Sequence, residues 1–306
     1  MAKYVWVIDA IRRRGKISYK ELNEKWLDNT DLSRGEYLPK RTFDNWRYQI
    51  FDIFKINIEN ENCGEYRYYI ANEADMRSNT LTSWLYQSFS VGNTLMKSQQ
   101  VKDRILLEYV PSSQDWLHTI IEAMKENKVL FITYRIYGKE ECYTDVQPYC
   151  VKLFRQRWYM VGKVDWDEEN LRIYSLDRIL DVQVKDETFK MPKNWSAKEY
   201  FEESYGIIVD KNTDIEKVTL RVTNGQANYI RDLQLHELQE EYQQDDGYSL
   251  FTYRLRPTCD FIQEILWQGE NVEVLEPLSL RTEIKEKLKR MLNNYKKKSS
   301  WKISQR

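Results

Sequence analysis

The sequence predicts a multidomain α+β protein, and three observations carry that prediction. Helical periodicity with clear start signals fills most of the first 50 residues. Short apolar strand patterns separated by turn residues follow one another from residue 129 to residue 184. In the last third of the chain, strand and helix patterns alternate in the order β-α-β-β-α-β. Each pattern buries a different kind of surface, so we expect a separate core for each.

The composition is that of a folded protein with several domains. At 306 residues the chain is long enough for two or three domains, and 42% hydrophobic residues supply their cores. Aromatic residues make up 14%, led by Tyr and Trp, which suit barrels, interfaces and surfaces that stack on bases. The net charge of −1 leaves nucleic-acid binding open, because such binding needs a basic face rather than a basic chain.

Sequence motifs for catalysis, metal binding and membrane insertion are missing. The cysteines Cys63, Cys142, Cys150 and Cys259 have neither metal nor redox spacing, and only two histidines accompany them. A Gly-rich phosphate loop and a nucleophile elbow are both absent. The N-terminus lacks the apolar core of a signal peptide, and no stretch approaches the ~20 apolar residues of a membrane span. We therefore expect a cytoplasmic protein with no metal, no cofactor and no enzymatic activity.

Residues 1–71 predict a winged helix-turn-helix. A first helix over Tyr4–Arg14 ends at Gly15. Ser18 and Glu21 have the spacing of a capping box, with apolar residues on either side as a hydrophobic staple. This signal begins a second helix that runs to about Leu27.

A third helix and a hairpin complete this predicted domain. The helix follows the polar stretch Asp28–Tyr37 and has Pro39 near its first position. Its apolar stripe, at spacing i, i+3 and i+7, consists of Phe43, Trp46 and Ile50. Strand patterns at Ile56–Ile58 and Tyr66–Ile70 around Cys63-Gly64 then predict the hairpin that forms the wing.

The polar side of the third helix carries side chains that can contact phosphates and base edges in a major groove. We predict duplex binding by Lys40, Arg41, Thr42, Asn45 and Gln49. The alternative is that these residues form an ordinary solvated helix face. The link between the second and third helices is longer than the turn of a compact motif, which leaves open a different groove-reading geometry.

Residues 72–112 predict a helical linker between domains. Its apolar residues over 72–100 follow a helical pattern, which fits either a linker or a dimerisation helix. A strand is expected at Arg104–Val110, and Pro111 should end it. A helix with Trp116, Ile120 and Met124 at spacing i, i+4 and i+8 follows.

Five strand patterns within residues 113–192 predict a small antiparallel β-barrel, whose closure would remove exposed sheet edges. The predicted strands are Val129–Tyr137, Cys142–Phe154, Arg157–Val164, Leu171–Leu176 and Ile179–Val184. The helix pattern before them belongs to the same predicted domain.

This region resembles the WYL domain, a sensor module of bacterial transcription regulators. The resemblance covers residues 116–189 and rests on several elements in the family's order. Trp158-Tyr159-Met160 stands where the family has Trp-Tyr-Leu, a change that conserves volume. The family's Arg-x-aromatic-x-Leu-x-Arg-Ile element is matched by residues 172–179. The resemblance implies a barrel of the Sm/SH3 type.

In the family, basic and hydroxyl side chains on the barrel receive a negatively charged effector, in some members single-stranded nucleic acid or a nucleotide. Carried over to this sequence, the resemblance implies effector binding by Tyr134, Tyr149, Arg172 and Arg178. Further candidates are Tyr159 of the name motif and the basic residues Arg157 and Lys163, which flank that motif on the same strand parity. Arginine can bind phosphate through two hydrogen bonds, and tyrosine can stack on a base. The alternative gives Trp158 and Tyr134 to the core and pairs Arg178 with Asp177 or Asp181. Several family members carry a basic residue inside or just after the name motif. Here Met160-Val161-Gly162 stands at that place, and the first basic residue is Lys163, so the effector of this protein can differ from theirs.

Residues 213–296 predict a ferredoxin-like α+β domain from the order β-α-β-β-α-β. The order is similar to that of the extension that often follows WYL domains and helps them to dimerise. The final predicted helix, Ser279–Tyr295, has an apolar face that needs a partner. The basic tail Lys296–Lys298 is read either as solvated or as a nonspecific phosphate contact.

These predictions favour a dimeric transcription regulator that binds a DNA operator and an anionic effector, with no membrane association. The rival hypothesis is an accessory module that binds single-stranded nucleic acid and modulates a partner enzyme. A third is a purely structural protein whose head has lost DNA binding.

Overall fold

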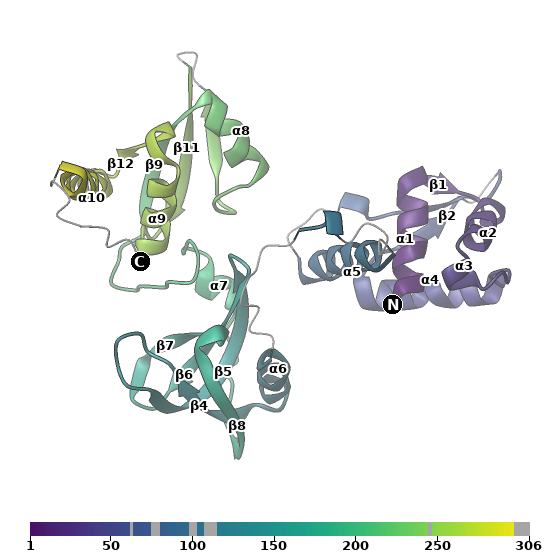
Figure 1. Cartoon of the computed structure of the whole chain (residues 1–306), viewed down its shortest axis with the longest axis horizontal. Coiled ribbons are helices and arrows are strands. Elements are labelled where there is room, and N and C mark those ends of the chain that lie inside the picture. Colours follow the sequence, from purple (N-terminus) through teal and green to yellow (C-terminus); the bar gives the residue numbers. More distant parts are fainter. Residues whose placement is uncertain (62–63, 75–79, 98–102, 107–114, 244–246, 297–306) are drawn as a thin grey trace, which may run out of the picture. The chain divides into compact units, whose positions relative to one another are not determined.

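The computed structural model describes residues 1–61, 64–74, 80–97, 103–106, 115–243 and 247–296 (Figure 1). The chain divides into two compact units, Met1–Glu108 and Tyr109–Arg306. Among the described residues, the first unit has one hydrophobic core and the second unit has two.

The first unit begins with helices whose bounds follow local start and stop signals. These helices are α1 (Ala2–Arg14), α2 (Tyr19–Asp28), α3 (Thr30–Ser33) and α4 (Lys40–Phe54). The capping box before α2 is confirmed: the Glu21 amide donates to the Ser18 hydroxyl at 3.3 Å, and the Ser18 amide donates to the Glu21 carboxylate at 2.9 Å. Pro39 is the N-cap of α4 rather than its first residue. The short helix α3 lies inside the polar stretch Asp28–Tyr37, where no helix was predicted.

A small antiparallel sheet of strand order β1-β3-β2 completes this unit. Its strands are β1 (Lys16–Ile17), β2 (Ile58–Asn60) and β3 (Tyr68–Ile70). The predicted hairpin strands are therefore shorter or shifted, and β1 was not predicted because two residues carry no periodicity. Cys63, at the predicted turn, lies outside the described residues. Helix α5 (Leu81–Lys97) packs on the same core through Tyr86, whose hydroxyl donates to Asp9 on α1 at 2.5 Å.

The stripe that the sequence predicted on the third helix is the buried side of α4. Phe43, Trp46 and Ile50 are buried in one core with residues of α1, α2 and β3. Arg47, on the flank of that stripe, donates from Nε to the carbonyl of Ile58 at 3.0 Å. This bond connects α4 to β2, the first strand of the hairpin. The face of α4 opposite the buried stripe is exposed to solvent.

The second unit begins with a helix and a five-stranded antiparallel sheet of order β7-β6-β5-β4-β8. The elements are α6 (Leu117–Glu126), β4 (Lys128–Tyr134), β5 (Cys142–Phe154), β6 (Arg157–Val164), β7 (Asp167–Ser175), the short 3-10 helix η3 (Leu176–Arg178) and β8 (Ile179–Thr188). The bounds of β5 and β6 match the prediction residue for residue, whereas β7 and β8 are longer than predicted.

The predicted closure of this sheet into a barrel is wrong for the described residues. Strands β7 and β8 are the two ends of the sheet and do not pair with each other. Strand β5 pairs with β4 through its first half and with β6 through its second half, so one long strand serves both sides of the fold. Ile120 and Ala123 of α6 are buried in the same core as the sheet's inner residues, so this helix covers the apolar face instead.

Gly162 explains how β5 and β6 approach so closely. A Cβ at this position would lie 2.4 Å from a Val146 methyl carbon and 2.7 Å from the backbone oxygen of Gln147. Because backbone cannot move out of the way as a flexible side chain can, only glycine fits here.

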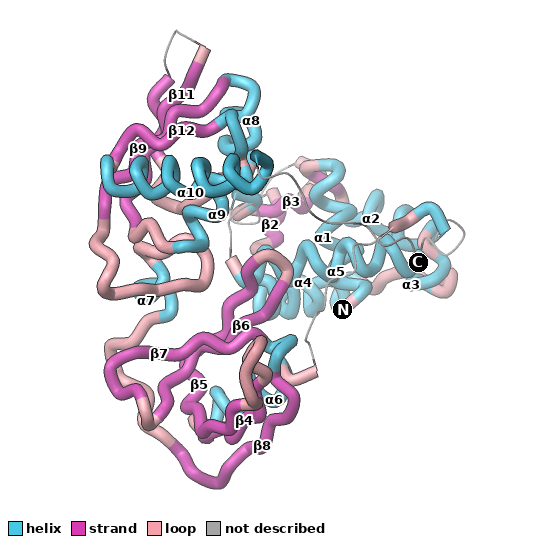
Figure 2. Tube along the Cα trace, turned by 60° about the vertical axis from the view of Figure 1, so that its left-hand side comes forward, coloured by secondary structure: helices cyan, strands magenta, loops and turns pink. Residues whose placement is uncertain are grey.

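A connector with helix α7 (Ala197–Phe201) leads to the C-terminal sheet, whose strand order is β10-β11-β9-β12. Its elements are β9 (Glu216–Thr223), α8 (Asn224–Asp232), β10 (Glu240–Gln243), β11 (Tyr248–Leu255), α9 (Cys259–Trp267), the short 3-10 helix η4 (Gly269–Asn271), β12 (Val272–Glu276) and α10 (Leu278–Lys296). Residues of α8, α9 and α10 share one core with β9, β11 and β12, so all three helices pack on this sheet (Figure 2).

Some predicted segments fall partly outside the described residues. Of the predicted strand Arg104–Val110, residues 104–106 are described and form no strand, and the remainder lies outside. Pro111 and Lys297-Lys298 also lie outside the described residues.

Candidate functional site

The exposed face of α4 brings together part of the predicted duplex-binding set. Arg41 and Asn45 are exposed one turn apart, and within the described part of the chain neither forms a hydrogen bond or an ion pair. Thr42 beside them is half-buried. Two of the most suitable side chains for phosphate and base contacts are therefore free to bind.

The other two predicted residues of α4 are already engaged. Lys40 donates to Asp44 at 2.5 Å, and its ammonium lies 5.1 Å from the centre of the Tyr68 ring on β3. Gln49 accepts a hydrogen bond from the Tyr4 hydroxyl. Both residues thus contact the body of the unit, and we expect them to contribute less to binding than Arg41 and Asn45.

Tyr48 is a residue of this face that the sequence reasoning missed. Its side chain is 76% exposed, and it follows Arg41 and Asn45 at spacing i, i+4 and i+7. Residues at that spacing share one side of a helix. The same periodicity that identified the buried stripe could have revealed Tyr48 as part of the opposite face.

On the five-stranded sheet, Tyr134 and Arg178 form an aromatic and cationic stack. The Arg178 guanidinium lies 4.7 Å from the centre of the Tyr134 ring and 4.5 Å from that of Tyr137. Its Nε donates to the carbonyl of Arg135 at 3.0 Å, which fixes the plane of the group. The pairing of Arg178 with Asp177 or Asp181, expected as an alternative, does not form.

Arg157 and Tyr159 of β6 lie next to the end of β7, close to this stack. Tyr159 lies opposite Ser175 across β6 and β7. The Ser175 amide donates to the Tyr134 hydroxyl at 3.2 Å, and the Ser175 hydroxyl bonds to Asp177. Arg157 approaches the same carboxylate at 3.7 Å. Burial raises the pKa values of Tyr134 and Tyr159, so both hydroxyls stay protonated at neutral pH and can donate hydrogen bonds.

We call this group, defined by Tyr134, Arg157, Tyr159, Asp177 and Arg178, the sheet cluster. Its two guanidinium groups and one carboxylate sum to a charge of +1. Each arginine keeps donors that its present partners do not use, because guanidinium has five N–H groups. The sheet cluster can therefore bind an anion. Its Tyr134 ring is 7% exposed and packs in the sheet's core, as the alternative expected, so of its tyrosines only the half-buried Tyr159 is left to lie beside a flat group.

The remaining predicted effector residues lie elsewhere on the sheet or in its core. Arg172 pairs with Asp167 at 2.5 Å and stacks on Trp166 near the other end of β7. Lys163 lies opposite Gln147. Tyr149 is buried, with its ring stacked 5.9 Å from that of Phe189, and burial raises its pKa. We therefore assign Tyr149 to the core.

Lys152 is a second residue that sequence reasoning missed. It lies opposite Tyr159 on β5, its Nζ donates to the carbonyl of Gly206 at 2.5 Å, and it sits 3.7 Å from the centre of the Phe201 ring. Burial lowers its pKa to about 8. No sequence signal marks it, because the residues that bury it come from the connector about fifty positions away.

The turn between β5 and β6 connects the sheet to the C-terminal helices. Arg155 forms an ion pair with Glu264 on α9, and the Tyr205 hydroxyl donates to the same carboxylate at 2.8 Å. Phe154 packs edge-on against Tyr205 at 5.8 Å. A chain of contacts thus runs from Tyr159 in the sheet cluster, along the hairpin, to α9.

Asp260, on the first turn of α9, makes a second connection. Its Oδ2 accepts hydrogen bonds from the amides of Ile207 at 2.9 Å and Ile208 at 3.0 Å. The residue before Ile207 is Gly206, whose carbonyl accepts a hydrogen bond from the Lys152 ammonium. Gly206 has φ +79°, and a Cβ there would lie 2.6 Å from Asp260, so the close approach requires glycine.

Neither a metal site nor a membrane span is found where the structure can be described. Within the described ranges, no three His, Cys, Asp or Glu residues are grouped so that they could hold a metal ion. The helices of the same ranges include none that is both long and apolar enough to cross a membrane.

Comparison with protein families matches the five-stranded sheet and its helix to the WYL domain over residues 115–184, and the C-terminal sheet to the WCX domain over residues 214–292. The chain contains a WYL domain followed by a WCX domain. The WYL match covers the sheet cluster, and the WCX match covers the α9 carboxylates that the β5–β6 turn and the connector contact.

Comparison with solved structures gives matches that include two of low similarity. One is the proteasome accessory factor B/C (PafBC) of Arthrobacter aurescens, at 15% identity and a TM-score of 0.39, covering 100% of this chain and 49% of that one. The chain thus spans about half the length of PafBC. The other is described as a CRISPR Cas-related protein, at 10% identity and a TM-score of 0.38, covering 87% of this chain and 76% of that one. A search of curated proteins found no match.

Proposed function

We propose that the protein is a cytoplasmic, DNA-binding transcription regulator whose WYL domain binds an anionic effector, either nucleic acid or a nucleotide. It would act by binding rather than by catalysis. The observation that carries the proposal is the occurrence of a WYL and a WCX domain after a unit whose α4 presents Arg41, Asn45 and Tyr48 to solvent.

The N-terminal unit would serve as a winged helix. In support, the three longer helices α1, α2 and α4, together with the short α3, precede a hairpin, and the hairpin pairs with the short strand β1 between α1 and α2. In such a domain the last helix before the hairpin enters the major groove. Arg41 and Asn45 would then reach bases or phosphates, while Lys40 and Gln49 hold the helix on the unit.

The sheet cluster would be the effector site. A phosphate could replace Asp177 as the partner of Arg157 and bond to the unused donors of Arg178. A base could stack on Tyr137, which is 70% exposed. The exposed side chains of the site, Arg157 and Tyr137, favour a flexible ligand such as a short single strand.

Effector binding would reach the WCX domain through the β5–β6 hairpin. Tyr159 of the cluster and Lys152 lie side by side on this hairpin, and its turn contacts α9. We propose a ferredoxin-like fold for the WCX domain from its element order and strand order, and we propose that it forms a homodimer. The exposed Leu288, Met291, Leu292 and Tyr295 of α10 supply apolar surface for that contact.

Binding to duplex DNA tests the proposed role of the N-terminal unit. We would measure the affinity for duplex DNA from the protein's own upstream region, comparing wild type with Arg41→Ala combined with Asn45→Ala. The expected cost is about 1–3 kcal/mol for each lost base contact, and the salt slope should fall by about one unit for each lost phosphate contact. Arg254→Ala, at an exposed site on β11, is the matched control. Unchanged binding by the double variant would refute the assignment of α4.

Effector binding tests the sheet cluster. Short single-stranded oligonucleotides should bind wild type, and Arg178→Ala combined with Arg157→Ala should weaken that binding by about tenfold or more. If the oligonucleotides bind through the cluster but no specific duplex binds the head, the rival hypothesis of an accessory single-strand-binding module replaces the regulator. If binding stays within about twofold in the double variant, the cluster is not the effector site.

A further inference from the structure

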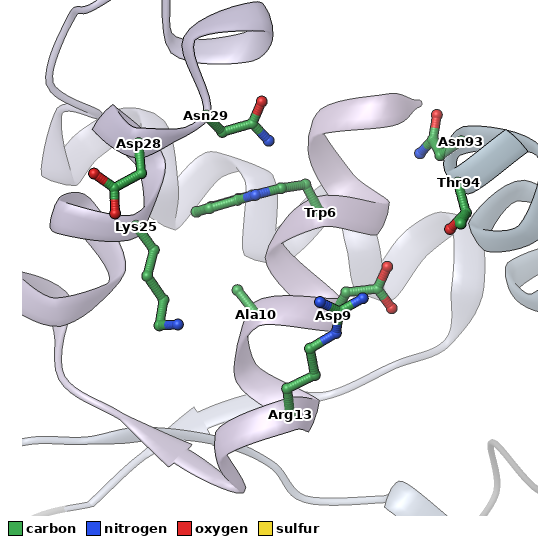
Figure 3. A pocket seen from close by; sticks show the side chains of 9 residues that line it. All are labelled: Trp6, Asp9, Ala10, Arg13, Lys25, Asp28, Asn29, Asn93 and Thr94. Atoms are coloured by element: carbon green, nitrogen blue, oxygen red, sulfur yellow. The ribbon is translucent and has the colours of Figure 1, made fainter. Parts of the chain in front are cut away.

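A cavity that shares no residue with the sheet cluster lies in the N-terminal unit. It has a volume of about 560 Å³, within the range of small-molecule sites. Three helices form its walls: α1, the end of α2, and α5 (Figure 3). The α1 residues that line it, Trp6, Asp9, Ala10 and Arg13, follow one another at helical spacing and so present a single face to the cavity. We call it the three-helix pocket.

The pocket has a flat apolar floor. Trp6 packs edge-on against Trp26, with ring centres 5.1 Å apart, which holds the indole in place. Ala10, one turn further along α1, is small and leaves space beside the indole. A planar ligand can stack on such a fixed ring with little loss of side-chain entropy.

Two cationic side chains, Arg13 and Lys25, line the same pocket. Within the described part of the chain, Arg13 of α1 and Lys25 of α2 form neither a hydrogen bond nor an ion pair. Figure 3 shows both side chains on one side of the Trp6 ring, with Asn29 on the other side. An acidic group placed between them would gain two charge-assisted hydrogen bonds.

The acidic residues of the pocket have different roles. Asp9 is already held from α5, because its carboxylate accepts hydrogen bonds from the Tyr86 hydroxyl at 2.5 Å and the Ser90 hydroxyl at 3.2 Å. Asp28 has no such partner among the described residues and lies at the C-terminal end of α2, where backbone carbonyls add partial negative charge. This end of the pocket favours a hydrogen-bond donor of the ligand.

We propose that the three-helix pocket binds a small planar molecule that carries an acidic group and a hydrogen-bond-donating group. A nucleoside monophosphate and an aromatic amino acid share this chemistry. Because Asn93 and Thr94 of α5 also line the pocket, a bound ligand contacts all three helices and stabilises the packing of α5 on the head. The protein would then receive a second input, independent of duplex binding and of the sheet cluster.

Calorimetric titration of the full chain with AMP and, separately, with L-tryptophan tests this proposal. At least one of them should bind with one site per chain in the pocket, and the one that binds identifies the source of the ligand. Arg13→Ala and Lys25→Ala should each weaken that binding by about tenfold or more, since each removes a charge-assisted bond. Bound ligand should also raise the melting temperature of the wild-type chain.

Two matched controls separate the pocket from other binding. Lys20→Ala, on an exposed position of α2 that does not line the pocket, should leave the affinity within about twofold. Arg178→Ala should also leave it unchanged, because it affects the sheet cluster alone. Binding of neither ligand would overturn the proposal, as would binding that survives both pocket variants or that Arg178→Ala abolishes. All four substitutions are at side chains that reach solvent, and equal melting temperatures without ligand check that each variant is folded.

Discussion

Lys152 provides the sharpest test of the physical picture, because its environment depends on the connector. Burial lowers its pKa from 10.5 to about 8. The nearby carboxylates of Asp260 and Glu237 favour the charged form and oppose this lowering of the pKa. In the unfolded chain Lys152 should titrate near 10.5.

The sign of the pH dependence follows from this difference. Below pH 8 the lysine is charged in both states, and the folded state bears the whole cost of burying the charge. Between pH 8 and 10.5 the folded state loses the proton first, so the unfolded state binds more protons and stability rises with pH. For these two pKa values the gain from pH 7 to pH 9.5 is about 2 kcal/mol, and the full shift of 2.5 units corresponds to about 3 kcal/mol.

The assay has two parts. NMR of the full chain with ¹³C-labelled lysine, assigned by comparison with Lys152→Met, should show one lysine titrating near pH 8. Urea unfolding of wild type, Lys152→Met and the exposed control Lys193→Met should then show that only Lys152→Met loses the gain in stability between pH 7 and pH 9.5. A Lys152 titration at its ordinary value near 10.5 would refute the reasoning, because it would mean that the connector does not bury the ammonium.

Three further predictions concern the fold around the sites. Gly162→Ala should lower the free energy of unfolding by about 3 kcal/mol, since its Cβ would meet Val146 and backbone, whereas Gly225→Ala, with nothing within 4 Å, should cost little; equal stability of the two variants would contradict the close approach of β5 and β6. Asn23→Ala should lower the free energy of unfolding by about 2–3 kcal/mol in urea, because the buried Asn23 amide donates to the Leu38 carbonyl and accepts from the Leu38 N–H. A loss below about 0.5 kcal/mol would show that these Leu38 groups find other partners. Arg155→Ala should leave effector affinity within about twofold but reduce the effect of effector on duplex binding, measured by duplex titration with and without effector, and an undiminished effect would exclude the β5–β6 turn from the coupling.

Much of the local structure could be predicted from the sequence. The capping box at Ser18 and Glu21 located the start of α2, and the bounds of β5 and β6 agree with the predicted ranges. These elements have signals that a short window contains: a cap, a run of alternating residues, or an apolar stripe. Strand β1 and helix α3 were missed because they are too short for any periodicity.

The predicted effector-binding residues were only partly brought together by the structure. Residue type and family resemblance identified Tyr134, Arg157, Tyr159 and Arg178, which the structure brings together. The same reasoning also included Tyr149, which is buried against Phe189, and Arg172, which pairs with Asp167. Residue type says what a side chain can bind, but its neighbours decide whether it remains available.

The sequence by itself determined most of the longer elements, their order and the domain family, because caps, periodicity and motif order are properties of neighbouring residues. Only the tertiary structure decided that the five-stranded sheet stays open under α6, that Lys152 is buried beneath the connector, and that Arg13 and Lys25 face one pocket. Each of these depends on contacts between residues far apart in the chain. Burial and charge pairing arise from such contacts, and no local pattern in the sequence records them.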